Sequence, residues 1–290
     1  MSALIGGDVY LKLESEQLTG SFKVRGAFNA LSLLSPEERA RGIVASSAGN
    51  HGLGVAEAAQ RLGIAATVFV PSNAPTVKKD GIARRGAHVV DEASDYDDAM
   101  VRARAFAHET GATFVHPCLG VPLLAGQGTV GSEVLEELPD VQTMLVCVGG
   151  GGLLGGVGAF LLSEAPHVRV IGVQSERTNA MARALEAGKV IEIENLPTLA
   201  DGLAGQVDDD ALAIGQATLE SIVTVTEEEI ASAIAWLWLA EGIRAEGSGA
   251  VCVAALRTGR LQHLVPPIAA IVSGANIDEA RLQGILQAAG

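Results

Sequence analysis

Short apolar runs alternate along this chain with longer stretches whose apolar residues recur at helical spacing. The apolar runs predict strands at 43–46, 66–70, 88–90, 113–116, 143–148, 169–173 and 268–272. The longer stretches predict helices that include 51–62, 95–110 and 121–137. The strand candidates are apolar on both faces, which is typical of parallel strands covered by helices. The alternation therefore predicts an α/β protein with parallel-rich twisted sheets flanked by helices.

Two helix starts are marked by their capping residues. Ser35-Pro36-Glu37-Glu38 combines a capping hydroxyl, a first-turn proline and a capping-box glutamate. Thr226-Glu227-Glu228-Glu229 has the same hydroxyl-to-glutamate spacing before an apolar stretch. No low-complexity linker, repeat or charge block separates these elements, so two domains must arise from the chain crossing between them.

The composition narrows the class of partner. Of 290 residues, 34 are acidic and 20 are basic, giving a formal net charge of −14. Nucleic-acid binding depends on Lys and Arg at the phosphates, and anionic membranes attract the same residues. The charge therefore predicts that neither nucleic acid nor a membrane surface is a partner. Glycine is in excess, at 35 residues, which indicates many tight turns or close backbone approaches.

The stretch 141–163 carries no charge and is long enough to span a bilayer. Seven of the ten residues from 149 to 158 are glycine, however, and glycine is a poor residue for a helix interior. A strand, a glycine turn and a helix explain the stretch better. The amino terminus has no signal-peptide pattern, and the three cysteines, Cys118, Cys147 and Cys252, are widely spaced. We therefore expect a reduced, cytoplasmic setting.

Lys23 follows a Thr-Gly-Ser turn at the start of an apolar helix and is one of only five lysines. On its own it fits a surface position. A partly desolvated lysine near a helix amino terminus has, however, the lowered pKa that Schiff-base chemistry requires.

Three further turns lie between a strand and a helix. The turn 46–52, Ser-Ser-Ala-Gly-Asn-His-Gly, could bind an anion or simply cap a helix. The turn 273–278 is, on its own, an ordinary helix cap. The run Gly149–Gly152 is different, because four glycines cost entropy without adding packing and leave backbone N–H groups free to surround a phosphate.

The same run allows a second interpretation. Gly150, Gly152 and Gly155 match the dinucleotide fingerprint, and Glu176 follows the next predicted strand. An NAD-dependent oxidoreductase is therefore an alternative, although no other segment specifies hydride transfer. The sequence contains no Walker lysine, H-E-x-x-H, C-x-x-C or G-x-S-x-G motif, and His116-Pro117-Cys118 is interpreted as structural.

In this order, the four elements resemble the pyridoxal-phosphate enzymes of the serine/threonine dehydratase and serine racemase family, which have the tryptophan-synthase-β fold (fold type II). Matching segments run from Val9-Tyr10-Leu11-Lys12-Leu13-Glu14 through Ala125-Gly126-Gln127-Gly128-Thr129 to Ser273. The resemblance therefore covers nearly the whole chain. It implies a large cofactor-binding domain, residues 1–40 and 120–290, and a small substrate-loop domain, residues 41–119, with pyridoxal 5′-phosphate as the cofactor.

The resemblance also implies a role for each motif residue. Lys23 would bind the cofactor as a Schiff base and act as base at the substrate Cα, and Ser273 would face the pyridine nitrogen. The implied cofactor-binding residues are Phe22, Lys23, Asn50, Gly149, Gly150, Gly151, Gly152, Leu153, Glu246 and Ser273. The implied substrate-binding residues are Ser47, Ala48, Gly49, Asn50 and His51.

A serine hydroxyl does not keep the pyridine nitrogen protonated as a carboxylate would, which favours β-elimination over reprotonation. We therefore expect an ammonia-lyase that converts a β-hydroxy amino acid, such as L-threonine or L-serine, to a 2-keto acid and ammonia. Serine racemase and 3-hydroxyaspartate dehydratase are alternatives within the family. Racemases of the family carry a serine at the position of Ala48, and alanine has no proton to give. A pyridoxal-phosphate binder without turnover is a further alternative.

The chain departs from the family pattern in three places. The family usually has additional residues before the lysine, and no regulatory domain is expected after Gly290. Acidic residues that hold a divalent cation in some members correspond to Gln174 and Ala180 here, so no metal site is expected. We expect a homodimer or a higher homo-oligomer.

Overall fold

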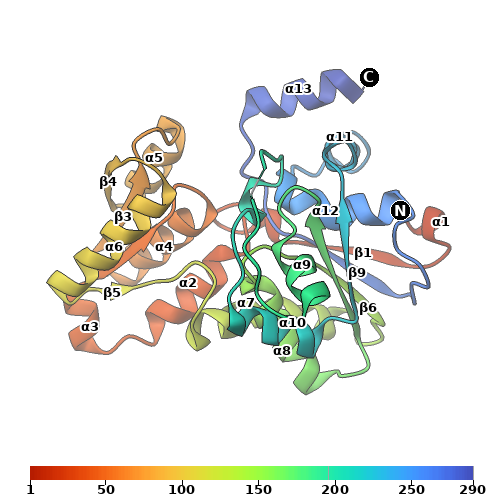
Figure 1. Cartoon of the computed structure of the whole chain (residues 1–290), viewed down its shortest axis with the longest axis horizontal. Coiled ribbons are helices and arrows are strands. Elements are labelled where there is room, and N and C mark those ends of the chain that lie inside the picture. Colours follow the sequence, from red (N-terminus) through yellow and green to blue (C-terminus); the bar gives the residue numbers. More distant parts are fainter. Residues whose placement is uncertain (195, 290) are drawn as a thin grey trace. The chain divides into compact units, whose positions relative to one another are not determined.

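The computed structural model describes residues 1–194 and 196–289, which form two compact units (Figure 1). Unit 1 comprises Met1–Glu16 and Gln127–Gly290, and unit 2 comprises Gln17–Gly126. The sequence places the domain boundaries near residues 41 and 119 instead, so the segment that carries Lys23 packs within unit 2. The functional domain boundaries remain a prediction.

Unit 2 is built on a parallel four-stranded sheet in the order β4-β3-β2-β5. Its strands are β2 (Ile43–Ser46), β3 (Ala66–Pro71), β4 (His88–Ala93) and β5 (Thr113–Phe114). Its helices are α2 (Lys23–Ser32), α3 (Pro36–Arg41), α4 (Asn50–Leu62), α5 (Thr76–Ala83) and α6 (Tyr96–Thr110). Each strand is parallel to its neighbours, with Ile43 of β2 level with Ala66 of β3 and Thr113 of β5.

Helices cover both faces of this sheet. Ala45 of β2 packs in a core cluster with Val55 of α4. The next residue back, Val44, packs in a second cluster with Ala99 and Ala103 of α6. Because successive side chains of a strand point to opposite faces, α4 and α6 lie on opposite sides of the sheet. This arrangement explains why these strands are apolar on both faces.

Unit 1 contains a parallel five-stranded sheet in the order β1-β9-β6-β7-β8. Its strands are β1 (Val9–Leu13), β6 (Thr143–Cys147), β7 (Arg169–Ser175), β8 (Ser221–Val225) and β9 (Ile268–Val272). The first and last strands of the chain lie side by side, with Val9 level with Ile268 (Figure 1). β9 also pairs with β6, so the segments that follow β6 and β9 leave the same edge of the sheet.

The other elements of unit 1 are helices and two short 3₁₀ turns, and α7 begins in the last residues of unit 2. They are α1 (Ser2–Ile5), α7 (Val121–Glu137), α8 (Gly152–Glu164), α9 (Ala180–Ala187), α10 (Asp209–Thr218), α11 (Glu227–Glu241), α12 (Gly247–Arg257) and α13 (Glu279–Ala289), with 3₁₀ turns η1 (Glu14–Glu16) and η2 (Asp201–Leu203). α12 is the central helix: every residue from Gly247 to Leu256 is buried. It contacts four of the five strands, β6 to β9.

The main predictions from the sequence are confirmed. All seven predicted strands are present, and all are parallel. Ser35 and Thr226 both form capping boxes, with the hydroxyl accepting from the N–H of Glu38 and of Glu229. Two strands, β1 and β8, were not predicted. The uncharged stretch 141–163 contains β6, a turn and α8, and no helix of the described residues is long and apolar enough to cross a membrane.

Candidate active site

Lys23 is the first residue of α2 and lies partly buried beside a segment of distant sequence. Its Nζ donates a hydrogen bond to the carbonyl oxygen of Pro117 at 2.7 Å and lies 4.0 Å from the Sγ of Cys118. Nζ also lies over the ring of Phe22, 5.2 Å from the ring centroid. The ammonium group is therefore held in place by a carbonyl and an aromatic face, and it does not extend into solvent as a surface lysine would.

The segment after β5 supplies this lysine contact through its backbone. The Nδ1 of His116 accepts hydrogen bonds from the N–H groups of Cys118 (3.1 Å) and Leu119 (3.0 Å). These bonds close a turn around Pro117. The sequence-based interpretation of His116-Pro117-Cys118 as purely structural missed its contact with Lys23. A backbone carbonyl leaves no mark in a side-chain pattern, so no signal in the sequence pointed to it.

The predicted carboxylate loop connects β2 to α4 in the same unit. The N–H of Gly49 donates to the Oγ of Ser47 at 3.1 Å, and Ala48 and Asn50 are partly buried. Gly49 is the cap of α4, and no side chain caps that helix. The amino terminus of a helix without a side-chain cap presents N–H groups to an anion. The loop therefore has the geometry expected for binding a carboxylate.

His51 is placed differently from the rest of this loop. Its side chain is buried, and its Nε2 lies 2.9 Å from the carbonyl oxygen of Val115. Burial, together with the nearby Lys23 ammonium and with His116, lowers the pKa of His51 from 6.5 to about 3. The imidazole is therefore neutral at physiological pH, and it points into the protein.

Within the same unit, α2 and α4 approach each other very closely. A Cβ on Gly54 of α4 would lie 3.0 Å from the backbone carbon of Lys23. A Cβ on Gly52 would lie 2.1 Å from the carbonyl oxygen of Ser47. Glycine at these positions therefore lets α4 pack against the backbone of the lysine helix at Gly54 and against the backbone of Ser47 at Gly52.

In unit 1, the glycine run follows β6 and leads into α8. Gly151 has φ +88°, and it caps α8 without a side-chain hydrogen bond. A Cβ on Gly151 would lie 2.9 Å from the Cβ of Ala211, and a Cβ on Gly149 would lie 2.9 Å from the Cα of Leu203. A left-handed glycine turn before a helix without a side-chain cap is a typical phosphate cradle.

The two other predicted cofactor residues of unit 1 lie together. The Oγ of Ser273, directly after β9, donates to the carbonyl oxygen of Ser248 at 3.3 Å. Glu246 caps α12 at the same place, and its backbone N–H donates to the carbonyl oxygen of Gly274 at 3.0 Å. Ser273 and Glu246 are both buried. Because β9 pairs with β6, this pair lies at the same sheet edge as the glycine run.

The sequence did not identify a buried network that supports the glycine run. The carboxylate of Glu227 accepts hydrogen bonds from the hydroxyls of Ser175 (2.8 Å) and Thr198 (2.7 Å) and from the N–H of Leu199 (2.5 Å). Residues 198–203 then enter η2, where Leu203 lies against Gly149. Glu227 appeared in the sequence only as a first-turn acid of α11, which it also is.

Three buried hydroxyls adjoin these motifs without a hydrogen-bond partner among the described residues. Ser21 precedes Phe22, Ser46 precedes the loop 47–51, and Ser248 lies beside Ser273. A buried hydroxyl without a partner costs free energy, so such groups mark places where a ligand or water is expected. In unit 1, the cradle of Gly149 and Gly151 and the unpartnered hydroxyl of Ser248 fit a phosphorylated, polar cofactor.

Two other sequence expectations concern the turn after β7. The Nε2 of Gln174 donates to the carbonyl oxygen of Val148 at 3.1 Å, and its Oε1 accepts from the N–H of Ala182 at 2.9 Å. Gln174 thus joins the strand before the glycine run to α9, of which Ala180 is the first residue. The absence of a metal site remains a prediction. Glu176, the acid of the NAD alternative, is exposed.

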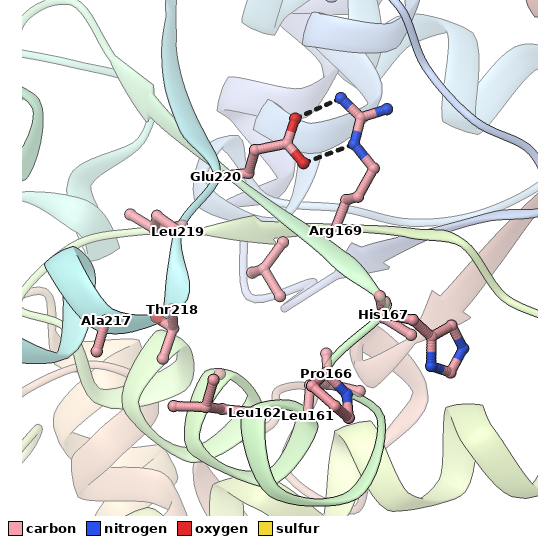
Figure 2. Close-up of a pocket in the computed structure, with 12 residues that line it drawn as sticks. Leu161, Leu162, Pro166, His167, Arg169, Ala217, Thr218, Leu219 and Glu220 are labelled. Carbon is pink, nitrogen blue, oxygen red and sulfur yellow. Dashed lines mark hydrogen bonds and ion pairs between the residues drawn. The ribbon is translucent and has the colours of Figure 1, made fainter.

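A cavity of about 250 Å³ opens on the opposite edge of the unit 1 sheet (Figure 2). Leu161 and Leu162 of α8 line one side of it, and Leu219 lines another. Arg169 and Glu220 form an ion pair at its edge, with Nε to Oε2 at 2.6 Å. Arg169 begins β7 and Glu220 precedes β8, so the cavity lies at the amino ends of the strands and away from the glycine run.

Comparison with known proteins gives one consistent family. The L-threonine ammonia-lyase of Thermotoga maritima is 45% identical over 287 residues, which cover 99% of this chain and 71% of that protein. The catabolic L-threonine dehydratase of Staphylococcus aureus is 38% identical, covering 97% of this chain and 82% of that protein.

Solved structures agree with these relatives. Threonine deaminase isoform 2 from Solanum lycopersicum superposes with a TM-score of 0.93 at 34% identity, covering 100% of this chain and 85% of that one. Maize serine racemase gives a TM-score of 0.94 at 30% identity, covering 99% and 89%. The family model described as "Pyridoxal-phosphate dependent enzyme" matches residues 1–274. The cradle, the lysine and the fold agree with this match, and the chain belongs to the family of pyridoxal-phosphate-dependent enzymes.

Proposed function

We propose that this chain is an ammonia-lyase that removes the hydroxyl and amino groups of a β-hydroxy amino acid such as L-threonine or L-serine. The products are a 2-keto acid and ammonia. The observation that carries the proposal is the placement of Lys23, a partly buried amine held against Pro117 at the start of α2. It occupies the lysine motif of a chain whose relatives include an L-threonine ammonia-lyase at 45% identity.

Pyridoxal phosphate, when bound, supplies the electron sink for negative charge at the substrate Cα. Lys23 would bind the cofactor covalently and then, as a free amine, take the proton from Cα. The N–H groups at the start of α8, exposed by Gly151, would bind the phosphate. The N–H groups at the start of α4 would bind the substrate carboxylate. Ser273 would offer a hydroxyl to the ring nitrogen in place of a carboxylate, which would favour loss of the β-hydroxyl over transamination.

The supporting positions are also proposals. Phe22 would flank the ring, Asn50 would bind the ring oxygen, and Glu246 would lie near the ring. The remaining residues of the cradle and of the carboxylate loop would act mainly through their backbone. They are Gly149, Gly150, Gly152 and Leu153 for the phosphate, and Ser47, Ala48 and Gly49 for the substrate.

A panel of amino acids tests the activity. Keto-acid release is measured from L-threonine, L-serine and 3-hydroxyaspartate, with the Lys23→Ala variant as the control. The same protein is reduced with borohydride and digested, and the labelled peptide is identified by mass spectrometry. We expect keto acid from at least one substrate and a pyridoxyl label on Lys23. A label on another lysine, or turnover that survives Lys23→Ala, would refute the proposal. A label without turnover on any substrate would indicate a cofactor binder.

Racemisation is the second candidate, and the maize serine racemase structure at 30% identity favours it. Ala48 argues against it, because racemases of the family carry a serine at this position and alanine has no proton to supply. Chiral chromatography of serine recovered from the reaction separates the two activities. We expect little of the opposite enantiomer while pyruvate accumulates.

The setting of the enzyme is part of the same proposal. We propose a cytoplasmic homodimer, because the three cysteines form no disulfide bond among the described residues and α11 presents the exposed side chains of Trp238 and Leu239. Large exposed apolar side chains that lie together are common at subunit interfaces. Light scattering of the eluted protein measures the oligomer, and a monomer at micromolar concentration would contradict this part.

A further inference from the structure

His51 is the one histidine of the described residues that is fully buried, and its hydrogen bonding is incomplete. Its relative exposure is 3%, and its Nε2 lies 2.9 Å from the carbonyl oxygen of Val115. A carbonyl only accepts, so Nε2 carries the proton and Nδ1 carries the lone pair. Nδ1 has no hydrogen-bond partner among the described residues.

If the His51 side chain only filled the core, an imidazole would be less stable at this position than an apolar side chain. Leaving a buried acceptor unpaired costs free energy that an apolar side chain would not cost. The imidazole also lies close enough to Lys23 for the ammonium charge to oppose its protonation. We therefore expect the His51 imidazole to have a role in addition to packing in the core.

The bond that His51 makes ends on the segment that receives the lysine. The carbonyl of Val115 accepts from Nε2, and two residues later the carbonyl of Pro117 accepts from the Nζ of Lys23 at 2.7 Å. The N–H of Val115 donates to Val44 at 2.8 Å, which continues the pairing of β5 with β2. His116 closes the turn on the other side by accepting from Cys118 and Leu119.

We propose that His51 is a positioning residue for Lys23, because its Nε2–H fixes the segment 115–117 and so places the Pro117 carbonyl that receives Nζ. A Schiff-base nitrogen has at most one proton, whereas a free ammonium has three. The Pro117 carbonyl thus serves the lysine in its free form, before the cofactor is captured and after the lysine is released by substrate. The inference rests on the proposed role of Lys23.

Replacing His51 by glutamine or by asparagine tests this role, because the two side chains carry the same amide group but differ in length. The side-chain nitrogen of glutamine occupies roughly the place of Nε2, while that of asparagine occupies roughly the place of Nδ1. His51→Gln therefore keeps the donor to Val115, and His51→Asn loses it. Val68→Ala, in the core of the same unit, is the control for a general loss of stability.

The readout is capture of the cofactor by the apo protein. Pyridoxal phosphate is added, its aldehyde condenses with Nζ with loss of one water, and the absorbance change gives the rate. Borohydride reduction and mass spectrometry confirm that Lys23 is the residue labelled. We expect His51→Asn to slow capture about tenfold, the effect of about 1.4 kcal/mol. His51→Gln should stay close to the wild type, and Val68→Ala should not slow capture even with a similar loss of melting temperature.

The possible results separate the inference from the proposed function. Equal rates for the two amide variants, or a slower rate for His51→Gln, would overturn the positioning role while the label on Lys23 stood. A wild-type label elsewhere would instead refute the function itself. Should His51→Asn fail to fold, ring nitrogen NMR of the wild type decides: a proton on Nδ1 in place of Nε2 would overturn the inference.

Discussion

The carboxylate of Glu227 lies 2.5 Å from the backbone nitrogen of Leu199, and this contact joins the first turn of α11 to the segment that enters η2. A Cβ on Gly247 would lie 2.0 Å from the carbonyl oxygen of the same Leu199. The segment is thus held between a buried carboxylate and the first residue of α12. The segment ends at Leu203, whose backbone lies so close to Gly149 that a side chain there would not fit. The glycine run is therefore supported by residues with no part in the chemistry.

Glu227→Gln should weaken this support. Every group bonded to the carboxylate is a donor in the structure, and a neutral amide replaces these charge-assisted hydrogen bonds with weaker ones. We expect a loss of about 1–3 kcal/mol in the free energy of unfolding, measured by urea denaturation. Glu228→Gln, at the exposed neighbouring position, should change it by less than about 0.5 kcal/mol. Equal effects for the two variants would contradict this role of Glu227.

Gly149→Ala should loosen the phosphate cradle. The new Cβ would lie 2.9 Å from the Cα of Leu203, and backbone on both sides must move to admit it. We expect the dissociation constant for pyridoxal phosphate to rise about tenfold or more, equivalent to about 1.4 kcal/mol, measured by equilibrium dialysis. The control is Gly284→Ala in α13, where a Cβ meets nothing within 4 Å. That variant should keep the affinity and gain up to about 1 kcal/mol of stability.

Ala48→Ser should raise racemisation. The substitution supplies a hydroxyl at the position where the racemases of the family have one, and a positioned acid or base contributes about 10²-fold or more to a proton transfer. We expect D-serine formation from L-serine to increase at least about tenfold, measured by chiral chromatography. Ser47→Ala, one residue earlier in the loop, should show no increase. Unchanged enantiomer formation with intact keto-acid release would show that this position does not control reprotonation.

The stability of the protein should depend on His51 at acidic pH. Burial and Lys23 lower the pKa of His51 from 6.5 to about 3. The unfolded chain protonates this ring near pH 6.5 and the folded chain only near pH 3. The unfolded state therefore binds more protons between these values, and stability falls as the pH drops through that window.

His51→Gln should remove this contribution. Relative to the variant, the wild type should lose up to about 1.4 kcal/mol per pH unit below pH 6.5. Above about pH 7 the difference between the two should be constant. Urea denaturation at a series of pH values from 4 to 8 measures it. Parallel pH profiles for the two proteins would show that His51 titrates normally in the folded state.

Glu220→Gln, at the edge of the cavity of Figure 2, should slightly lower the stability of the protein without changing the reaction. The ion pair with Arg169 is partly exposed, with side-chain exposures of 26% for Arg169 and 44% for Glu220, and such pairs are worth about 0.2–1 kcal/mol. The guanidinium lowers the pKa of Glu220 through their hydrogen bonds. We expect a small loss of stability that shrinks at high salt, with unchanged keto-acid release. A large fall in turnover would place the cavity in the functional site.

The sequence predicted seven strands, including β4 and β5 at the edges of the unit 2 sheet, but missed the two outer strands of the unit 1 sheet. The seven predicted strands are apolar on both faces, which is a pattern a single sequence displays. β1 and β8 are the outer strands of their sheet, and their side chains are mostly half-buried. An edge strand such as Val9–Leu13, with Lys12 in it, does not form a continuous apolar run, so its strand character is hidden.

Some residues of the candidate site could be predicted from the sequence and others could not. The lysine, the glycine run and Ser273 are visible because each is an unusual residue at a turn after a strand. Pro117 and Leu199 act through backbone atoms, and Glu227 acts on residues that are distant in sequence. Their parts in the site depend on which turns the fold brings together, and no local pattern records that.

The pairing of β1 with β9 determines the order in which the chain can assemble during synthesis. Unit 2 is continuous in sequence, so all of its strands have been synthesised by residue 126. Val9 of β1, by contrast, has its partner at Ile268, far later in the chain than any strand of unit 2. The first strand therefore has no partner strand until β9 is made, and the sheet edge that carries Ser273 can form only after all of unit 2 has been synthesised. In a nascent chain, Lys23 would thus be present before the sheet edge that carries Ser273 has formed.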